Sequence, residues 1–256
     1  MTVVSLASGS RGNACCVFAS GGAIMIDCGL GPRELKYRAA AAGVDLGLVS
    51  GLLLTHSHDD HIRGLGAFHR HFPAVRLFAN MMTAEASAWH QEIDLDDFDS
   101  FENGQPFDAG PFEISAFPVP HDTSDPVGYL VRADGQTYFH GTDIGTPLDS
   151  IGENLAEADI ATLESNHDIA LLHGSGRPWT LIQRIAGPRG HLSNDQACDL
   201  VRRFASSRLR KLRLAHLSQE CNAPHIAERA MRETLAGAGL GDVDLGVLSQ
   251  DSACMF

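Results

Sequence analysis

The chain lacks the features that define membrane proteins and disulfide-stapled proteins. No segment reaches the roughly 18 consecutive apolar residues of a transmembrane helix, and the N-terminus has no basic region followed by a long apolar core. The six cysteines include no Cys-x-x-Cys pair and no regular spacing, which argues against a disulfide framework and predicts reduced, mostly buried thiols. We therefore expect a soluble, cytoplasmic protein with no membrane partner.

Long linkers and internal repeats are also missing from the sequence. No stretch rich in Pro, Gly and Ser is long enough to separate domains, and no repeat is strong enough to indicate an array. Hydrophobic residues make up 44% of the 256 residues and charged residues 20%, close to globular averages, so the chain can bury a substantial core. We predict one domain spanning residues 1–256.

The pattern of apolar runs, glycine turns and helix signals favours an α/β fold. Short β-rich runs open each half of the chain and helical segments follow them, with some strands and helices alternating. Two sheets packed face to face with helices outside, an αββα sandwich of four layers, would bury both sets of strands. The expected strands cover residues 2–7, 15–19, 23–27, 51–55, 75–79, 159–163, 212–216 and 243–248, with short strands between 107 and 141; the expected helices cover about 32–43, 62–71, 83–92, 180–186, 194–206 and 224–236.

A cluster of potential metal ligands follows the apolar run from Gly51 to Thr55. The cluster reads His56-x-His58-x-Asp60-His61. Alternate residues of an extended chain point the same way, so His56 and His58 can reach one metal ion, and a turn after them aims Asp60 and His61 at a neighbouring ion. Zinc and similar divalent ions accept imidazole nitrogen and carboxylate oxygen. The alternative, a solvated polar loop, is disfavoured by this spacing.

The motif resembles the signature of the metallo-β-lactamase fold hydrolases, and further stretches extend the resemblance over nearly the whole chain. Within that superfamily the sequence is most similar to the WalJ (YycJ) group, which is related to the transfer-RNA 3'-processing nucleases and associated with 5'-to-3' DNA exonuclease activity. The matching stretches are Ser8-Gly9-Ser10 with Gly12-Asn13, Ile26-Asp27-Cys28-Gly29, Thr55 to His61, Pro120-His121-Asp122, Thr142-Asp143-Ile144-Gly145, Leu163 to Asp168, Gly190 to Asn194, and His216-Leu217-Ser218.

The resemblance implies two divalent metal ions, with zinc favoured and manganese or iron also compatible. His56, His58 and His121 would hold the first ion; Asp60, His61 and His216 would hold the second; Asp143 would bridge both. By themselves His121 and Asp143 read as turn residues, and His216 as the end of an apolar strand. The β-lactamases proper usually carry cysteine where this chain has Asp143, and the flavo-diiron proteins carry glutamate where it has His58, so neither of those subclasses fits.

Two ions about 3.5 to 4 Å apart can share a water, lower its pKa and support in-line hydrolysis of a phosphodiester by the bridging hydroxide. Asp60 is then the candidate to orient the water. His191 and His167 are the candidates to protonate the leaving oxygen, and Glu164 could accept a hydrogen bond from an imidazole and fix its tautomer. Asn13, in a glycine-rich turn, and Asn166 are candidate substrate contacts. For Asn166 and His167, substrate contact and scaffold remain open alternatives.

Net charge bears on the substrate class. A formal charge of -13 argues against indiscriminate binding to nucleic acid, since lysine and arginine supply most nonspecific affinity. Residues 177–213, however, hold nine basic residues against two acidic ones, whereas residues 92–113 hold eight acids and no base. The basic stretch includes His191 and ends just before His216, so we expect it to guide DNA towards the metal site. The alternative is a solvated helix face.

Together these observations favour a binuclear phosphodiester hydrolase that acts on DNA ends as an exonuclease. The main rival is hydrolysis of a small phosphodiester or another ester, which needs only the metals and one or two arginines. A metal-binding regulatory protein without activity is a second rival. A transfer-RNA processing enzyme is less favoured, because the long inserted arm of those relatives is absent. Cys221-Asn222 stands where the WalJ group usually shows paired asparagines, which puts a substrate contact there in doubt.

Overall fold

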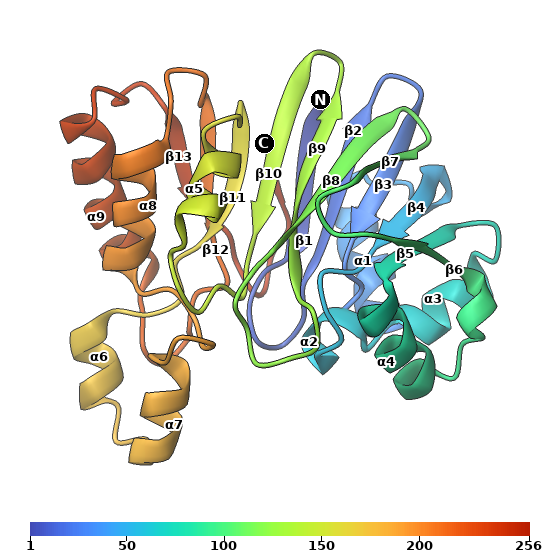
Figure 1. The fold of residues 1–256 in the computed structure, drawn as a ribbon, viewed down its shortest axis with the longest axis horizontal. Coiled ribbons are helices and arrows are strands. Elements are labelled where there is room, and N and C mark those ends of the chain that lie inside the picture. The colour runs from blue at the N-terminus through green and yellow to red at the C-terminus, as the bar shows by residue number, and fades with distance from the viewer.

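The computed structural model, which describes residues 1–256, contains two seven-stranded mixed sheets with helices on their outer faces (Figure 1). This is the expected αββα architecture. The first sheet has the order β14-β1-β2-β3-β4-β5-β6, formed by Cys254–Met255, Thr2–Ala7, Ala14–Ala19, Gly22–Ile26, Val49–Leu53, Arg76–Asn80 and Phe98–Phe101. The second has the order β13-β12-β11-β10-β9-β8-β7, formed by Asp244–Val247, Lys211–Ala215, Ile160–Glu164, Gln136–Gly141, Val127–Ala133, Phe112–Pro118 and Pro106–Ala109.

Helices cover the outer face of each sheet and also project from one end. In Figure 1 the helices α1, α3 and α4 lie on one side of the molecule, and α5, α8 and α9 lie on the other. The helices are α1 Pro32–Ala41, α2 Asp59–Ile62, α3 Leu65–His71, α4 Met81–Gln91, α5 Asp149–Leu155, α6 Ile169–Gly174, α7 Trp179–Ile185, α8 Asn194–Phe204 and α9 Pro224–Gly237. No helix here has the length and apolar character needed to cross a bilayer.

The core is built in three layers by strands that bury both faces. Along β1, Val3 belongs to the cluster between the two sheets, whereas Val4 belongs to the cluster beneath the helices of the first sheet. This alternation follows from the two-residue period of a strand. The central cluster takes Ile24 from the first sheet and Tyr129 from the second, so both sheets contribute to one core. All six cysteines are free and five are buried.

The strand directions bring several chain segments to one edge of the sandwich. β3, β4, β5 and β6 run parallel, as do β10, β11, β12 and β13. The carboxyl ends of parallel strands lie at the same edge, where loops can place functional groups. Four of these ends are followed directly by predicted site segments: β4 by residues 54–61, β10 by Thr142 and Asp143, β11 by residues 165–167, and β12 by His216.

Some element predictions were wrong in detail. The helix predicted over 62–71 is two helices: α2 begins earlier, at Asp59, and α3 begins at Leu65. The break occurs at Gly64, whose N–H donates to the carbonyl oxygen of Cys28 at 2.7 Å and whose missing Cβ would overlap the carbonyl oxygen of Leu30. Tertiary contact therefore overrides helix propensity at this point. The sequence prediction also omitted β6, β14, α5 and α6.

Candidate metal centre

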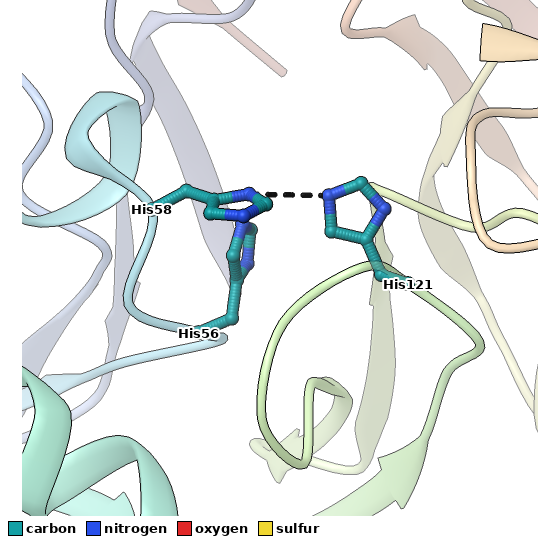
Figure 2. A group of neighbouring side chains, drawn as sticks. All are labelled: His56, His58 and His121. Carbon is teal, nitrogen blue, oxygen red and sulfur yellow. Dashed lines mark hydrogen bonds between the residues drawn. The ribbon is translucent and has the colours of Figure 1, made fainter. Parts of the chain in front are cut away.

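Three histidines from two loops come together at the edge of the sandwich. His56 and His58 follow β4, and His121 follows β8, and their ring nitrogens lie within 4.8 Å of one another. Figure 2 shows the three imidazoles pointing towards one another, with the dashed line joining His58 Nδ1 and His121 Nε2 at 3.2 Å. These are the three residues that the sequence assigns to the first ion.

A second group lies beside the first. Asp60, His61 and His216 also offer ligand atoms within 4.8 Å of one another. The Asp60 Oδ2 atom is 3.7 Å from His61 Nε2 and 3.5 Å from His216 Nε2. His216 reaches the group from the end of β12 in the second sheet, whereas the other two come from α2 beside the first sheet. These are the residues assigned by sequence to the second ion.

Asp143 connects the two groups. Its Oδ2 is 3.2 Å from His61 Nε2 in the second group, and its Oδ1 is 3.6 Å from His121 Nε2 in the first. The carboxylate is buried, with the residue only 2% exposed. Because Oδ1 is also 3.6 Å from His216 Nδ1, the carboxylate lies between the two groups, within reach of histidines from both.

Two potential ligand atoms of the centre are buried without a hydrogen-bond partner, as expected for atoms that bind metal ions. His56 Nε2 and Asp143 Oδ2 are buried without any hydrogen-bond partner, an arrangement that costs about 1–3 kcal/mol per group unless a ligand completes it. Burial lowers the pKa of His56 well below its ordinary value. The pKa of His58 is also lowered, mainly by burial and to a smaller extent by the nearby His121. Neutral imidazoles are the ligating form. Five imidazoles and two carboxylates thus make a suitable nitrogen and oxygen set.

Hydrogen bonds at the opposite ring nitrogens fix the orientation of three of these histidines. His61 Nδ1 contacts Asp27 Oδ2 at 2.7 Å, His121 Nδ1 contacts the carbonyl oxygen of Gly190 at 3.0 Å, and His216 Nδ1 contacts Glu164 Oε1 at 3.1 Å. Since each of these oxygens accepts, the Nδ1 atom carries a proton and Nε2 is the nitrogen left to bind an ion. Burial opposes charge on His61 and His216, but Asp27 and Asp143 respectively raise their pKa well above the ordinary value, so a bound ion would displace a proton from Nε2. In all three rings the Nε2 atom faces the ligand groups, as metal-binding histidines require.

Three of the six non-glycine residues with a positive φ lie at strand ends that carry the site. Asp27, Asp143 and His216 have φ angles of 59°, 58° and 55°. This left-handed conformation is uncommon for residues other than glycine, although aspartate, asparagine and histidine adopt it more readily than most. It turns each side chain out of its strand direction towards the cluster. Strain of this kind persists only where the surroundings hold it in place.

Glu164 and His191 form a polar pair next to the cluster. The Glu164 Oε1 atom accepts from His191 Nδ1 at 2.8 Å as well as from His216, and its Oε2 accepts from the backbone N–H groups of Ile144 and Leu192. Burial alone would raise the pKa of Glu164, but His191 and His216 lower it to about 2. Burial likewise opposes charge on His191, yet Glu164 raises the pKa of that imidazole above its ordinary value. The pair therefore holds a carboxylate and a readily protonated imidazole.

Comparison with known families agrees with this geometry. Residues 23–212 match the family model described as "Beta-lactamase superfamily domain". This chain belongs to the beta-lactamase superfamily. It is 33% identical over 239 residues to the Exodeoxyribonuclease WalJ of Streptococcus pneumoniae serotype 2 (strain D39), covering 92% of this chain and 88% of the relative. It is 30% identical over 238 residues to the Exodeoxyribonuclease YycJ of Bacillus anthracis, covering 92% and 89%. The resemblance to the WalJ group is thereby confirmed.

A solved structure supports the fold of this superfamily member. The metallo-beta-lactamase fold protein YhfI from Bacillus subtilis superposes with a TM-score of 0.73, covering 100% of this chain and 99% of its own, at 14% identity. At that identity the likeness establishes the fold alone. The four-layer sandwich predicted from the sequence is thus the metallo-β-lactamase fold.

The two asparagines nominated as substrate contacts lie in different surroundings. The side chain of Asn13 reaches the metal-ligand groups, since its Nδ2 is 3.0 Å from His61 Nε2 and 3.4 Å from Asp60 Oδ2. The side chain of Asn166 instead donates to the backbone carbonyl of His216 at 2.8 Å. These contacts favour a scaffold role for Asn166, one of the two alternatives left open by the sequence.

His167 and the Cys221-Asn222 corner are also tied into the scaffold. His167 is 2% exposed, its Nδ1 has no hydrogen-bond partner, and burial lowers its pKa to about 4. A neutral buried imidazole is a poorer proton donor than His191, whose side chain is partly exposed and whose pKa is raised, so burial and charge favour His191 of the two candidates. Asn222 donates to the backbone carbonyls of Ser165 and Asn166, and Cys221 is fully buried. This corner therefore supports the loop rather than presenting groups to a substrate.

The basic residues of the stretch 177–213 lie in separate places, and most of its arginines form ion pairs. Arg184 and Arg189 lie at the site, contacting the Asp122 carboxylate and the His121 carbonyl respectively. Arg208, Arg210 and Lys211 precede or begin β12, about 16 Å of extended strand away from His216 at its far end. Most of the arginines pair with acids outside the stretch, namely Glu220, Asp122, Asp149, Asp159 and Asp244. The stretch is therefore divided between the metal centre and the far end of β12, and five of its eight arginines form ion pairs with acids from other segments.

Sequence reasoning missed two acidic residues of the centre. Asp27 supports His61 and also accepts from the backbone N–H and hydroxyl of Thr55 at 2.9 and 3.0 Å. Asp122 places Oδ1 3.4 Å from His121 Nε2 while its Oδ2 pairs with Arg184. Both residues lie within stretches that carried the family resemblance. Asp27 could have been identified from its position at the end of the predicted strand that precedes β4, because the ends of neighbouring parallel strands lie side by side.

Asp27→Asn should weaken metal binding without removing a ligand. The amide oxygen can keep the Thr55 contacts, but the NH2 group would then face the His61 Nδ1–H and favour the tautomer with its proton on Nε2. Loss of an outer carboxylate of this kind typically costs about 10–100-fold in metal affinity, and we expect a loss in that range in a zinc titration against a competing chelator. Asp97→Asn is the matched control, because Asp97 pairs with His69 Nε2 at 3.1 Å away from the centre. Equal affinity in the two variants would contradict the supporting role of Asp27.

Proposed function

We propose that this chain is a metal-dependent phosphodiester hydrolase that digests DNA from its ends, as an exonuclease of 5'-to-3' polarity. The observation that supports the proposal most directly is the convergence of seven nitrogen and oxygen ligands from four strand ends, with the Glu164–His191 pair beside them. The relatives that match over 92% of this chain carry the name exodeoxyribonuclease. The 5'-to-3' polarity follows the resemblance to the WalJ group.

The residues can perform the steps that hydrolysis of a phosphodiester needs. Two divalent ions held by the seven ligands would acidify a water and offset the negative charge of the phosphate. Asp60 keeps a partly exposed carboxylate at 19% exposure, which can accept a hydrogen bond from the attacking water and set its direction. Glu164 holds the proton on Nδ1 of His191, and the 20% exposed imidazole can donate its Nε2 proton to the leaving oxygen.

Zinc is the ion we favour for this set, and manganese or iron are also compatible with it. Imidazole suits zinc and iron, while carboxylate and water suit manganese. A thiolate ligand would select zinc over manganese, and none is present among these seven ligands. The ion bound in the cell therefore depends on which metals are available there as well as on the geometry of the site.

The nuclease proposal is tested by presenting three substrates in parallel to metal-loaded protein: 5'-labelled duplex DNA, 5'-labelled RNA and bis(p-nitrophenyl) phosphate. We expect release of label from DNA as the earliest product, slower release from DNA labelled at the 3' end, and no activity after chelation. Turnover of the small ester alone would support the small-molecule phosphodiesterase. Tight metal binding without turnover of any of the three would support the non-catalytic alternative.

A further inference from the structure

A helical hairpin between two residues of the centre projects from the sandwich. α6 and α7 occupy the segment between Glu164 and His191, and Figure 1 shows them extending away from the sheets at the end of the molecule where α2 also lies. Their attachment is a small separate cluster formed by Leu172, Ile182 and Cys221. Because this cluster uses only three buried residues, most of the hairpin surface is free for contact with a ligand.

The free surface of the hairpin is unusually apolar. Trp179 is 59% exposed, Ile169 46% and Leu171 40%. The Trp179 ring has the exposed His173 ring as a neighbour, with the ring centroids 5.8 Å apart. Three large apolar side chains are thus exposed on a hairpin of 17 residues, with Trp179 the most exposed of them.

The hairpin is also basic in a chain that is strongly acidic. Its three arginines, Arg177, Arg184 and Arg189, accompany a single acid, Asp168, between residues 168 and 190. Arg177 and Arg184 form pairs with Glu220 and Asp122 that are partly exposed, and such surface pairs are weak enough for a phosphate to compete with them. The other tryptophan, Trp89, is 84% exposed but precedes the acidic segment 92–113, so the two tryptophans differ in their electrostatic surroundings.

Hydrogen bonds connect the hairpin directly to the metal centre. The end of α7 is held by the His191 N–H, which donates to the Ile185 carbonyl at 2.9 Å. Arg184 contacts Asp122 at 2.6 Å, and Arg189 donates to the His121 carbonyl at 2.8 Å. The seven residues of α7 span about 10 Å, which equals about three stacked nucleotides at a rise of roughly 3.4 Å.

We propose that the α6–α7 hairpin binds single-stranded DNA next to the scissile phosphate, with Trp179 stacking on an unpaired base and the hairpin arginines contacting phosphates. The inference rests on the proposed nuclease function and names the element that would hold its substrate. An aromatic platform combined with a positive groove is the usual means of binding single strands without sequence preference. A single strand fits better than duplex, because the faces of paired bases are stacked and inaccessible to Trp179. An apolar protein partner would not explain the excess of three arginines over one acid in residues 168–190.

Direct binding can be measured without turnover. In the full-length, metal-free Trp89→Phe protein, Trp179 is the only tryptophan, and we expect oligo(dT) to quench its fluorescence. Trp179→Ala should weaken oligo(dT) binding on the order of 10-fold, the loss typical of one stacking contact, measured by anisotropy of a labelled oligonucleotide. Trp89→Ala is the matched control and should bind as the parent protein does. Unquenched Trp179 fluorescence together with unchanged affinity in Trp179→Ala would overturn the inference and leave a protein partner as the explanation for the exposed surface.

Turnover measurements separate this inference from the nuclease proposal. With metal-loaded protein, Trp179→Ala should lower DNA digestion about 10-fold relative to turnover of bis(p-nitrophenyl) phosphate, whereas Trp89→Ala should leave that ratio unchanged. If the parent protein digests DNA and Trp179→Ala keeps the same ratio, the hairpin inference fails and the nuclease proposal stands. If the parent protein fails to digest DNA while Trp179 still responds to oligo(dT), the nuclease proposal fails and the single-strand site stands.

Discussion

Asp143→Asn is expected to lose bound metal and hydrolysis together. Asp143 presents Oδ2 to His61 and Oδ1 to His121, and so reaches both ligand groups. An amide offers only one oxygen, and its NH2 group, with no lone pair, would face the other group. Removing a group that only hydrogen-bonds to a metal ligand already lowers metal affinity or activity about 10–100-fold. Replacing a carboxylate that bridges the two ions should therefore lower turnover by more than about 100-fold. It should also reduce the metal content measured by atomic emission.

The backbone conformation allows a clean control for this substitution. Asp143 has a φ of 58°, and the exposed turn residue Asp134 has a φ of 51°. Since asparagine tolerates the left-handed region as well as aspartate does, Asp134→Asn should keep parental metal content and turnover, and neither variant should unfold through backbone strain. Full activity with parental metal content in Asp143→Asn would refute the bridging role and would leave the two ligand groups without a shared residue.

The contiguous part of the site was predictable from the sequence, because a strand places alternate side chains on one face. That rule covers His56 and His58, whereas Asp60 and His61 lie in the short helix α2 that follows, where the sequence analysis expected a turn. His121, Asp143 and His216 depended on the family resemblance, since each by itself resembles an ordinary turn or strand end. In the structure these seven residues lie in overlapping groups of potential ligands, and two of their atoms, His56 Nε2 and Asp143 Oδ2, are buried without a hydrogen-bond partner.

Interactions between distant segments could not be read from the sequence. The charge surplus of residues 177–213 is compensated by acids such as Asp149 and Asp244 that lie elsewhere in the chain, and a count along the sequence cannot show which charges meet. Asp27 was missed for the same reason, as its partner His61 lies 34 residues later. The break before α3 depends on the carbonyl groups of Cys28 and Leu30, which only the folded chain brings to Gly64.

Glu164→Gln should have the second large effect, because Glu164 sets the proton position on two histidines at once. The amide oxygen can accept from the Ile144 and Leu192 N–H groups, as Oε2 does now, which turns the NH2 group towards Nδ1 of His191 and His216. Two donors would then face each other unless both imidazoles move their protons to Nε2. On His216 that proton would occupy the atom facing the second ligand group, and on His191 the loss of the carboxylate would disfavour the imidazolium.

We therefore expect Glu164→Gln to lower turnover by about 10²–10⁴-fold and to lower metal affinity as well. The lower figure is typical for loss of a carboxylate that supports a metal ligand, and the higher figure for a catalytic histidine held in the wrong tautomer. His191→Ala separates the two effects, because His191 is not among the seven proposed metal ligands. That variant should keep parental metal content and lose activity mainly on DNA, whose alkoxide leaving group needs a proton, while p-nitrophenolate departs with little help. An equal loss on DNA and on bis(p-nitrophenyl) phosphate in His191→Ala would remove His191 as the proton donor and leave Glu164 as a support for His216 alone.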